Sequence, residues 1–139
     1  MWVGNELLHQ LTKEGRYKLK CDMFSRMGQQ RWWSAHYSNF VVFSEDTKYM
    51  MLVGGFLDSG WYDALKIHNG ARFTTYDSDN DIYRNKNCAA EMGAGFWWNG
   101  GCLTKYCGAN TALGSTGDFR WVHLSQGYSL SISRMYLTC

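Results

Sequence analysis

The sequence predicts one α+β domain that is richer in strand than in helix. Three observations support this prediction. A chain of 139 residues is the size of one ordinary domain. Apolar residues recur at helical spacing near the amino terminus, and several later stretches alternate between apolar and polar residues. The chain holds 15 glycines and no proline, so its turns depend on Gly, Asn, Asp and Ser.

The first element is a short helix. In residues 4–12, Asn5 is predicted to cap the helix amino terminus, because an Asn side chain can accept a hydrogen bond from a free backbone amide. The spacing puts Leu7, Leu8 and Leu11 on one side. The helix is expected to end before Gly15 and to lie beside the antiparallel strands that follow.

Three antiparallel strands are expected next, joined by polar turns. Strict alternation places Tyr17, Leu19, Cys21 and Met23 on one face of a half-buried strand. The second strand is expected to bulge near Ser38-Asn39, where its alternation breaks. The expected strands cover residues 17–23, 33–43 and 49–54, and the expected turns cover residues 28–31 and 45–48.

The second half is expected to contain more loop. Residues 61–65 are predicted to form one helical turn, and residues 72–76 a short strand that leads into an acidic cluster. Glycines are frequent between Cys88 and Gly117 and no periodicity persists there, which predicts a long structured loop, the kind of segment that often carries function. A closing strand alternates from Tyr128 and ends near residue 137.

The acidic cluster has three aspartates at alternate positions, Asp77, Asp79 and Asp81. Calcium takes six to eight oxygen ligands, and closely spaced aspartates supply them. An EF-hand is excluded, because Ile82 and Cys88 occupy the positions that require Gly and Glu. Two interpretations remain open: a calcium loop, and a solvated turn in which the aspartates cap backbone amides.

Composition excludes several classes of function. The formal charge is +2 and the basic residues are scattered, which argues against nucleic-acid binding. The five cysteines form no C-x-x-C pair and the four histidines have no zinc-ligand spacing. No G-x-S-x-G elbow or cysteine-protease motif occurs, so we expect a protein that is not an enzyme.

The cysteines and the aromatic composition, with 7 Trp, 9 Tyr and 7 Phe, favour a disulfide-bonded extracellular protein. The chain begins without a secretory signal, and no apolar run approaches the roughly 20 residues of a membrane span. We therefore expect secretion without membrane insertion, from a chain that is incomplete at its start.

The motifs resemble those of the fibrinogen C-terminal globular domain family, which includes fibrinogen chains, ficolins, tachylectins, angiopoietins and tenascins. The resemblance covers nearly the whole chain and keeps the family order. The matching pieces are WVGNELLHQLT, YKLKCDM, FVVFSEDTKYMMLVGGF, DAL, FTTYDSDND, NCA, the Trp97-Trp98 pair before Cys102, GDFRW and GYSLSISRM.

The resemblance implies a Ca²⁺ site in the acidic loop. Asp79 and Asp81 correspond to the side-chain ligands, and the backbone carbonyls of Tyr83 and Asn85 to the ligands that complete the site. Asp77 is then expected to lie behind these ligands. The resemblance also implies a disulfide between Cys88 and Cys102.

Lectins of this family bind acetylated sugars in a pocket beside that disulfide. This chain departs from the pattern at Leu103, where a His is common, and in the run LTKYCGANTALG, which replaces an Asn-rich segment. The residues that correspond to the pocket are Met92, Gly101, Cys102, Leu103, Trp121 and Tyr128.

The resemblance implies a fibrinogen C-terminal-like domain, residues 1–139, that lacks the family's N-terminal subdomain. Residues 1–70 are expected to form the central sheet and helix, and residues 71–139 the loop-rich calcium-binding and ligand-binding part. The implied function is a calcium-stabilised extracellular recognition module, a lectin-like binder of glycans or acetylated groups in innate immunity. The alternative is a receptor-binding or protein-binding module of the angiopoietin or tenascin type. Family lectins usually oligomerise through segments that this chain lacks.

The remaining tryptophans and cysteines have simpler interpretations. Trp97-Trp98 is expected to pack in the core, and we interpret Trp32-Trp33 and Trp61 in the same way. A Cys107–Cys139 bridge is our hypothesis for the extra pair. Cys21 is then either a buried free thiol or the partner of a cysteine outside this chain.

Overall fold

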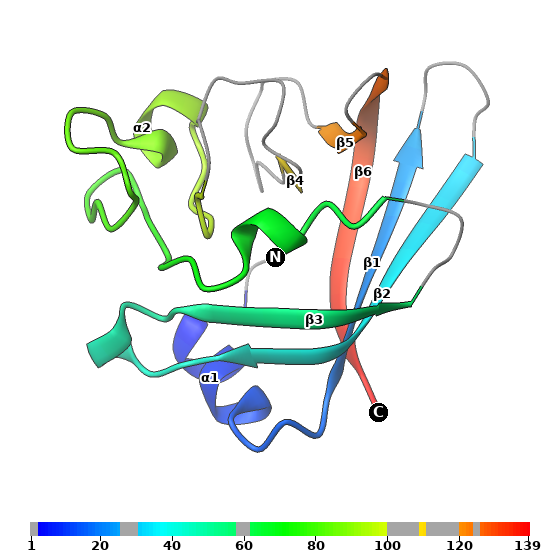
Figure 1. The fold of residues 1–139 in the computed structure, drawn as a ribbon, viewed down its shortest axis with the longest axis horizontal. Helices are drawn as coiled ribbons and strands as arrows, with labels where there is room; N and C mark the ends of the chain where they lie inside the picture. The colour runs from blue at the N-terminus through cyan, green and yellow to red at the C-terminus, as the bar shows by residue number, and fades with distance from the viewer. Residues whose placement is uncertain (1–2, 26–30, 58–61, 100–108, 111–119, 124–125) are drawn as a thin grey trace.

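The fold is a twisted antiparallel sheet that carries a helix and a long irregular segment on one face (Figure 1). The computed structural model describes residues 3–25, 31–57, 62–99, 109–110, 120–123 and 126–139, and the backbone alone at residues 25, 109–110, 120–123 and 126–131. The helices are α1 (Asn5–Thr12) and α2 (Cys88–Met92), with 3-10 turns η1 (Glu45–Thr47) and η2 (Lys66–His68). The strands are β1 (Lys18–Ser25), β2 (Arg31–Val42), β3 (Met51–Leu57), β4 (Ala109–Asn110), β5 (Arg120–His123) and β6 (Gln126–Thr138).

The strand order is β3-β2-β1-β6-β5-β4. The predicted meander is confirmed, since β1, β2 and β3 are consecutive antiparallel neighbours. The closing strand β6 then returns beside β1, with Lys18 opposite Thr138 and Phe24 opposite Ile132. In Figure 1, β3 lies nearly across the direction of β6, as expected for a sheet that twists from edge to edge. The α+β class predicted from the sequence is confirmed.

The inner face of the sheet carries the core. The predicted alternation in β1 is confirmed, because Leu19, Cys21 and Met23 are buried. Rows of side chains cross the strands, such as Leu137–Leu19–Tyr37, because antiparallel partners point to the same face. This face meets Leu8 of α1 and the aromatic residues of the irregular segment, so the first and second halves of the chain share one core.

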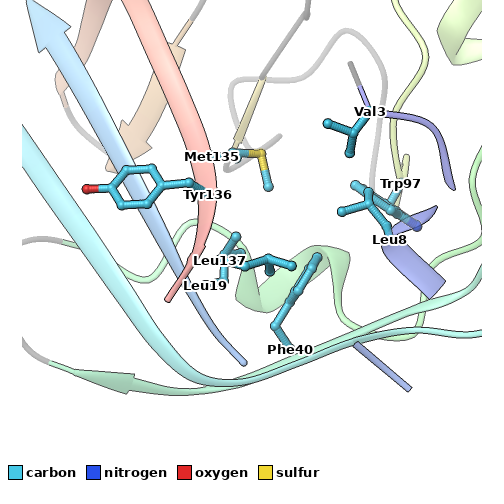
Figure 2. Close-up of a pocket in the computed structure, with 8 residues that line it drawn as sticks. All are labelled: Val3, Leu8, Leu19, Phe40, Trp97, Met135, Tyr136 and Leu137. Atoms are coloured by element: carbon cyan, nitrogen blue, oxygen red, sulfur yellow. The ribbon is translucent and has the colours of Figure 1, made fainter. Parts of the chain in front are cut away.

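An apolar pocket of about 80 Å³ lies where α1 approaches β6. Figure 2 shows Leu8, Phe40, Trp97 and Leu137 around it, with the Tyr136 ring directed away. Neighbouring residues of β6 therefore divide between the core and the outer face, as strand geometry requires.

The outer face of the sheet is exposed and mixed in character. Trp32 is 48% exposed and packs on Phe24 with ring centroids 5.3 Å apart. The core position that we predicted for Trp32 is therefore wrong. Because successive strand residues point to opposite faces, Trp32 and Trp33 cannot both face the core. Trp33 is half-buried, and Trp61 lies outside the described residues.

The start of α1 also differs from the prediction. The helix begins at Asn5, and Gly4 with φ 88° occupies the cap position, without a side-chain cap hydrogen bond. The predicted N-cap role of Asn5 is therefore wrong. Leu8 and Thr12 are the buried residues of α1, whereas Leu7 and Leu11 are 49% and 39% exposed. The Thr12 hydroxyl accepts the Val42 amide at 2.9 Å, and this bond turns the Leu8–Thr12 stripe toward β2.

Three elements of the second half were also predicted incorrectly. The helical turn predicted at residues 61–65 is the 3-10 turn η2, a few positions later, and the strand predicted at residues 72–76 is reduced to isolated bridges. The helix α2 was predicted as loop. Its five residues are too few to show a period, and the Asn87 side chain that caps it accepts the Ala90 amide at 2.9 Å.

The prediction of a bulge near Ser38-Asn39 is wrong, although the strand is irregular there. Tyr37 pairs with Phe56, and Phe40 pairs with Val53, so neither strand has an extra residue between these pairs. Between these two pairs, the alternation of buried and exposed residues shifts by one position in β2 and also in β3. Gly55, with φ 62°, lies at this change, and a Cβ there would collide with the Ser38 hydroxyl.

Gly55→Ala is expected to lower the free energy of unfolding by about 2 kcal/mol, because the substitution combines a left-handed backbone with a steric clash. Urea unfolding followed by circular dichroism measures this. Gly54→Ala is the matched control, since a Cβ at Gly54 meets nothing within 4 Å, and it should change stability much less. Equal effects of the two substitutions would contradict this account of Gly55.

Candidate functional site

The acidic loop leaves the core at Thr74 and is held there by a pair of backbone hydrogen bonds. The Thr74 amide donates to the Phe96 carbonyl at 3.0 Å, and the Phe96 amide donates to the Thr74 carbonyl at 3.1 Å. Phe96, Trp97 and Trp98 are all buried. The ring centroid of Phe96 lies 5.6 Å from that of Trp97 and 5.7 Å from that of Trp98. The base of the loop is therefore fixed to a buried aromatic cluster of the core.

Asn80 shapes the first turn of the loop. Its side-chain amide donates to the Phe73 carbonyl at 2.9 Å, and its backbone amide donates to the Thr74 hydroxyl at 3.1 Å. Sequence reasoning missed this residue. An Asn between two aspartates in a loop is a signal for such a turn, because its short side chain readily bonds to nearby backbone groups.

Asp81 joins the loop to α2. One carboxylate oxygen accepts the Tyr83 amide at 2.7 Å, and the other accepts the Cys88 amide at 2.9 Å. Asp79 accepts the Asp81 amide at 3.2 Å, and Asp77 accepts the Thr75 hydroxyl at 2.6 Å. Each aspartate therefore bonds within the loop, as the solvated-turn interpretation requires.

These hydrogen bonds are also compatible with a metal. A carboxylate oxygen has two lone pairs, so one amide bond leaves acceptor capacity. Asp79 is exposed and Asp81 half-buried, and the Tyr83 amide bond brings the main chain of Tyr83 beside the Asp81 carboxylate. No three His, Cys, Asp or Glu side chains of the described residues group as a metal site, so carbonyls would have to supply the other ligands. Asn85 is exposed in the same loop. The donor set fits Ca²⁺.

The chain matches, over residues 1–138, the family described as "Fibrinogen beta and gamma chains, C-terminal globular domain". It belongs to this family. It is 39% identical to human Ficolin-3 over 101 residues, which are 73% of this chain and 32% of that protein. It is 36% identical over 104 residues to Fibrinogen-like protein A of Apostichopus parvimensis, and the match covers 73% of this chain and 36% of that protein.

Solved structures of the family have the same fold. The fibrinogen-like globe domain of human ANGPTL2 superposes with a TM-score of 0.76 at 28% identity, covering 99% of this chain and 64% of that chain. The globe domain of human ANGPTL6 gives 0.76 at 26% identity, with 98% and 62% coverage. The chain therefore spans about a third of the curated relatives and just under two thirds of these globe domains.

Of the residues predicted for the ligand pocket of this fibrinogen-like domain, Met92 alone has a described side chain. It ends α2 and packs, half-buried, against the core. Gly101, Cys102 and Leu103 lie outside the described residues. Trp121 is in β5, where its backbone pairs with Tyr128 of β6. The register thus places Trp121 and Tyr128 opposite one another, while the pocket itself stays a prediction.

The cysteines divide into bonded and free. Cys88 is disulfide-bonded, and its partner lies outside the described residues, so the Cys88–Cys102 pairing stays a prediction. Cys139 is free and exposed, so the Cys107–Cys139 bridge that we hypothesised is wrong. Cys139 follows the end of β6, and Cys107 lies outside the described residues. Cys21 is a buried free thiol.

His68 is a second feature that sequence reasoning missed. It is fully buried, its Nδ1 donates to the Trp97 carbonyl at 2.8 Å, and its ring meets the Phe96 ring edge-on at 5.1 Å. Burial lowers the pKa of His68 to about 4, and the bond to the carbonyl offsets only part of this shift. The neutral imidazole thus supports the Trp97 backbone at the base of the acidic loop.

The described part of the chain has no helix with the length and apolar character of a membrane span.

Proposed function

We propose that this fibrinogen-like domain is a calcium-stabilised extracellular recognition module that binds glycans or acetylated groups in innate immunity. The observation that carries the proposal is the pair of bonds from Asp81 to the Tyr83 and Cys88 amides. These bonds connect the acidic loop to the disulfide-bonded start of α2, beside which the family places its ligand pocket. A cation held by the loop would therefore stiffen the ligand face rather than contact the ligand.

In this proposal, Asp79 and Asp81 bind Ca²⁺ through their side chains, and Tyr83 and Asn85 through their carbonyls. The ion offsets the repulsion among closely spaced carboxylates. Residues 1–70 serve mainly as scaffold, and residues 71–139 hold the metal and the ligand. The ligand face comprises Met92, Gly101, Cys102, Leu103, Trp121 and Tyr128.

Calcium is expected to raise the melting temperature of the domain, because an ion that binds only the native state stabilises it by about 2.7 kcal/mol at a hundred times its Kd. Calorimetry with calcium and with chelator measures this. Asp79→Asn should remove most of the calcium response, since Asn keeps an oxygen that can accept the Asp81 amide while the charge is lost.

Glu14→Gln is the control for charge removal, because Glu14 is exposed and lies outside the acidic loop. It should keep the full calcium response. An unchanged response in Asp79→Asn would remove the metal site from the proposal.

Elution from an immobilised N-acetylglucosamine column by free acetylated sugar tests the lectin function. We expect retention in calcium and release by N-acetylglucosamine but not by an equal concentration of sodium chloride. The similarity to human Ficolin-3 supports this expectation. Failure to bind in calcium would overturn the glycan proposal.

A second function is a receptor-binding or protein-binding module. The structural similarity to the ANGPTL2 and ANGPTL6 globe domains favours it, as does Leu103 in place of the common His. The lamprey fibrin D-dimer, which matches with a TM-score of 0.68 at 25% identity and covers 98% of this chain and 49% of that chain, was solved with a peptide ligand. If the domain binds a protein rather than a glycan, it should not be retained on the N-acetylglucosamine column, but calcium should still raise its melting temperature. Both functions are those of a secreted binding module rather than an enzyme, without nucleic-acid binding or membrane insertion.

A further inference from the structure

The outer face of the sheet, opposite the core, carries a compact group of side chains that we call the outer patch. The antiparallel register sets its members in rows across β2, β1 and β6. One of them is the Tyr136 ring, which Figure 2 shows directed away from the core. None of the members belongs to the calcium ligands or the ligand face proposed above. The rows of the outer patch are Trp32–Phe24–Ile132, Ser34–Asp22–Arg134 and Lys20–Tyr136.

The first row makes one end of the outer patch apolar. Trp32 is 48% exposed and Ile132 is 38% exposed. Phe24 lies between them in the register, and its ring centroid is 5.3 Å from that of Trp32. Exposed apolar side chains that contact one another, and tryptophan above all, are typical of surfaces that bind other proteins.

The acidic group of the outer patch is already paired within the patch. The Asp22 carboxylate accepts hydrogen bonds from the Ser34 and Tyr136 hydroxyls. It also lies 3.4 Å from the Lys20 Nζ atom. Burial raises the pKa of Asp22, but these three interactions outweigh burial and hold the pKa below its ordinary value. Asp22 is therefore charged at neutral pH, and its charge is balanced by Lys20.

Arg134 is the cation of the outer patch that has no acidic partner in the described part of the chain. It is exposed, and its guanidinium carbon lies 5.0 Å from the Trp32 ring centroid. Asp22 is its neighbour across the strands but forms its ion pair with Lys20. A guanidinium presents its N–H donors in a planar fork that matches a carboxylate. Arg134 can thus bind a carboxylate from another molecule directly beside the apolar row.

The size and the charge of the outer patch indicate what binds there. From Lys20 to Phe24 and across three strands it measures about 14 Å by 10 Å, or about 140 Å² in projection, whereas a stable interface buries about 800 Å² on each partner. The patch carries more cations than anions, so two copies of it would repel each other. Both properties favour a short segment of an acidic partner over a second copy of this chain.

We propose that the outer patch binds a short peptide segment of another protein, in which an acidic side chain for Arg134 lies next to a large apolar side chain for Trp32. This site is independent of the calcium loop and of the ligand face. It would give the domain a protein contact on the side of the sheet opposite the core.

Titration of the ¹⁵N-labelled domain with capped peptides, followed by NMR, tests the outer patch. The probe is the peptide GEEFLEG. Two matched peptides are GKKFLKG, which lacks the acidic residues, and GEESSEG, which lacks the apolar ones. GEEFLEG should shift the Trp32 indole signal and the Ser34 amide signal, and each matched peptide should bind at least tenfold more weakly. The affinity should be equal in calcium and in chelator, because the patch contains no residue of the acidic loop.

Arg134→Gln should weaken the binding of GEEFLEG about tenfold, the equivalent of about 1.4 kcal/mol, because it removes the charged fork and keeps a polar side chain. Trp32→Ala should weaken it by a similar factor, since exposed tryptophans often carry much of the energy of a protein contact. Arg72→Gln is the matched control, because Arg72 is exposed and lies outside β2, β1 and β6, and it should bind as the wild type does.

Absence of shifts at the outer patch with GEEFLEG overturns the proposal, as does unchanged affinity in both Arg134→Gln and Trp32→Ala. A dimer in sedimentation that Trp32→Ala dissociates would assign the face to a second copy and overturn the peptide. Binding of a heparin oligosaccharide at the patch in place of the peptide would overturn it as well. Loss of peptide binding in chelator would contradict the independence of the site, whereas failure of the N-acetylglucosamine column leaves the expected peptide shifts unchanged, so the two proposals fail separately.

Discussion

Trp97→Ala is expected to leave the domain largely unfolded at 25 °C. Trp97 is fully buried and packs edge-on against Phe40, Phe73 and Phe96. Truncating such a residue costs about 3–5 kcal/mol, and the loss of its Nε1–H leaves the Tyr49 carbonyl unpaired, for about 1–3 kcal/mol more. The total approaches the whole stability of a typical domain, which is about 5–15 kcal/mol. Urea unfolding followed by far-UV circular dichroism measures the loss.

Two variants show which part of Trp97 matters. Trp97→Phe keeps an aromatic ring but loses the bond to Tyr49, and we expect a loss of about 1–3 kcal/mol beyond the change in ring size. Trp32→Ala is the control for the same truncation at a half-exposed site, and it should cost about 1 kcal/mol. A Trp97→Ala protein as stable as Trp32→Ala would contradict the central role of Trp97.

His68 is expected to destabilise the domain as the pH falls from 6.5 to 4. The pKa of His68 is about 4 in the folded domain, against 6.5 for an ordinary histidine, so between these values the unfolded chain binds a proton that the native state does not. Stability therefore decreases as the pH falls through this window, by up to about 3 kcal/mol. Below pH 4 the contribution of His68 no longer changes. Urea titrations at half-unit steps of pH measure the slope.

Comparison with His68→Asn isolates this histidine from the carboxylates that also titrate. The Asn side-chain amide can donate to the Trp97 carbonyl as Nδ1 does, but it does not titrate. The variant should be less stable at pH 7, because it leaves a cavity, and its stability should fall less between pH 6.5 and 4. A slope unchanged in His68→Asn would refute the assignment.

Local pattern predicted the sheet well and the helix ends poorly. The alternation in β1 identified Leu19, Cys21 and Met23 as core residues, because residues two positions apart in a strand point to the same face of the sheet. A helix start depends on which residue supplies the cap, and in α1 Gly4 lies at the position that Asn5 was expected to fill. The stripe that α1 buries was set by a distant partner, since the Thr12 hydroxyl bonds to Val42 of β2.

The residues of the loop were predictable by type but not by role. Three alternate aspartates indicated a cation or a capped turn, and their hydrogen bonds follow the short-range geometry of Asp side chains. The bond from Asp81 to the Cys88 amide crosses seven residues, and the span includes no regular period from which it could be inferred. The contacts of His68 with Phe96 and Trp97 join segments far apart in the sequence, so no local pattern contains them.

The sequence by itself determined the α+β class, the antiparallel meander, the buried Trp97-Trp98 pair and membership of the fibrinogen-related family, because alternation and motif order are local properties. Only the tertiary structure decided that β6 pairs with β1, that His68 is buried with its ring bonded to the Trp97 carbonyl, and that Asn5, Lys48 and Tyr49 line one cleft. These arrangements depend on which distant surfaces meet when the core closes. The cleft beside the acidic loop arises from such a meeting.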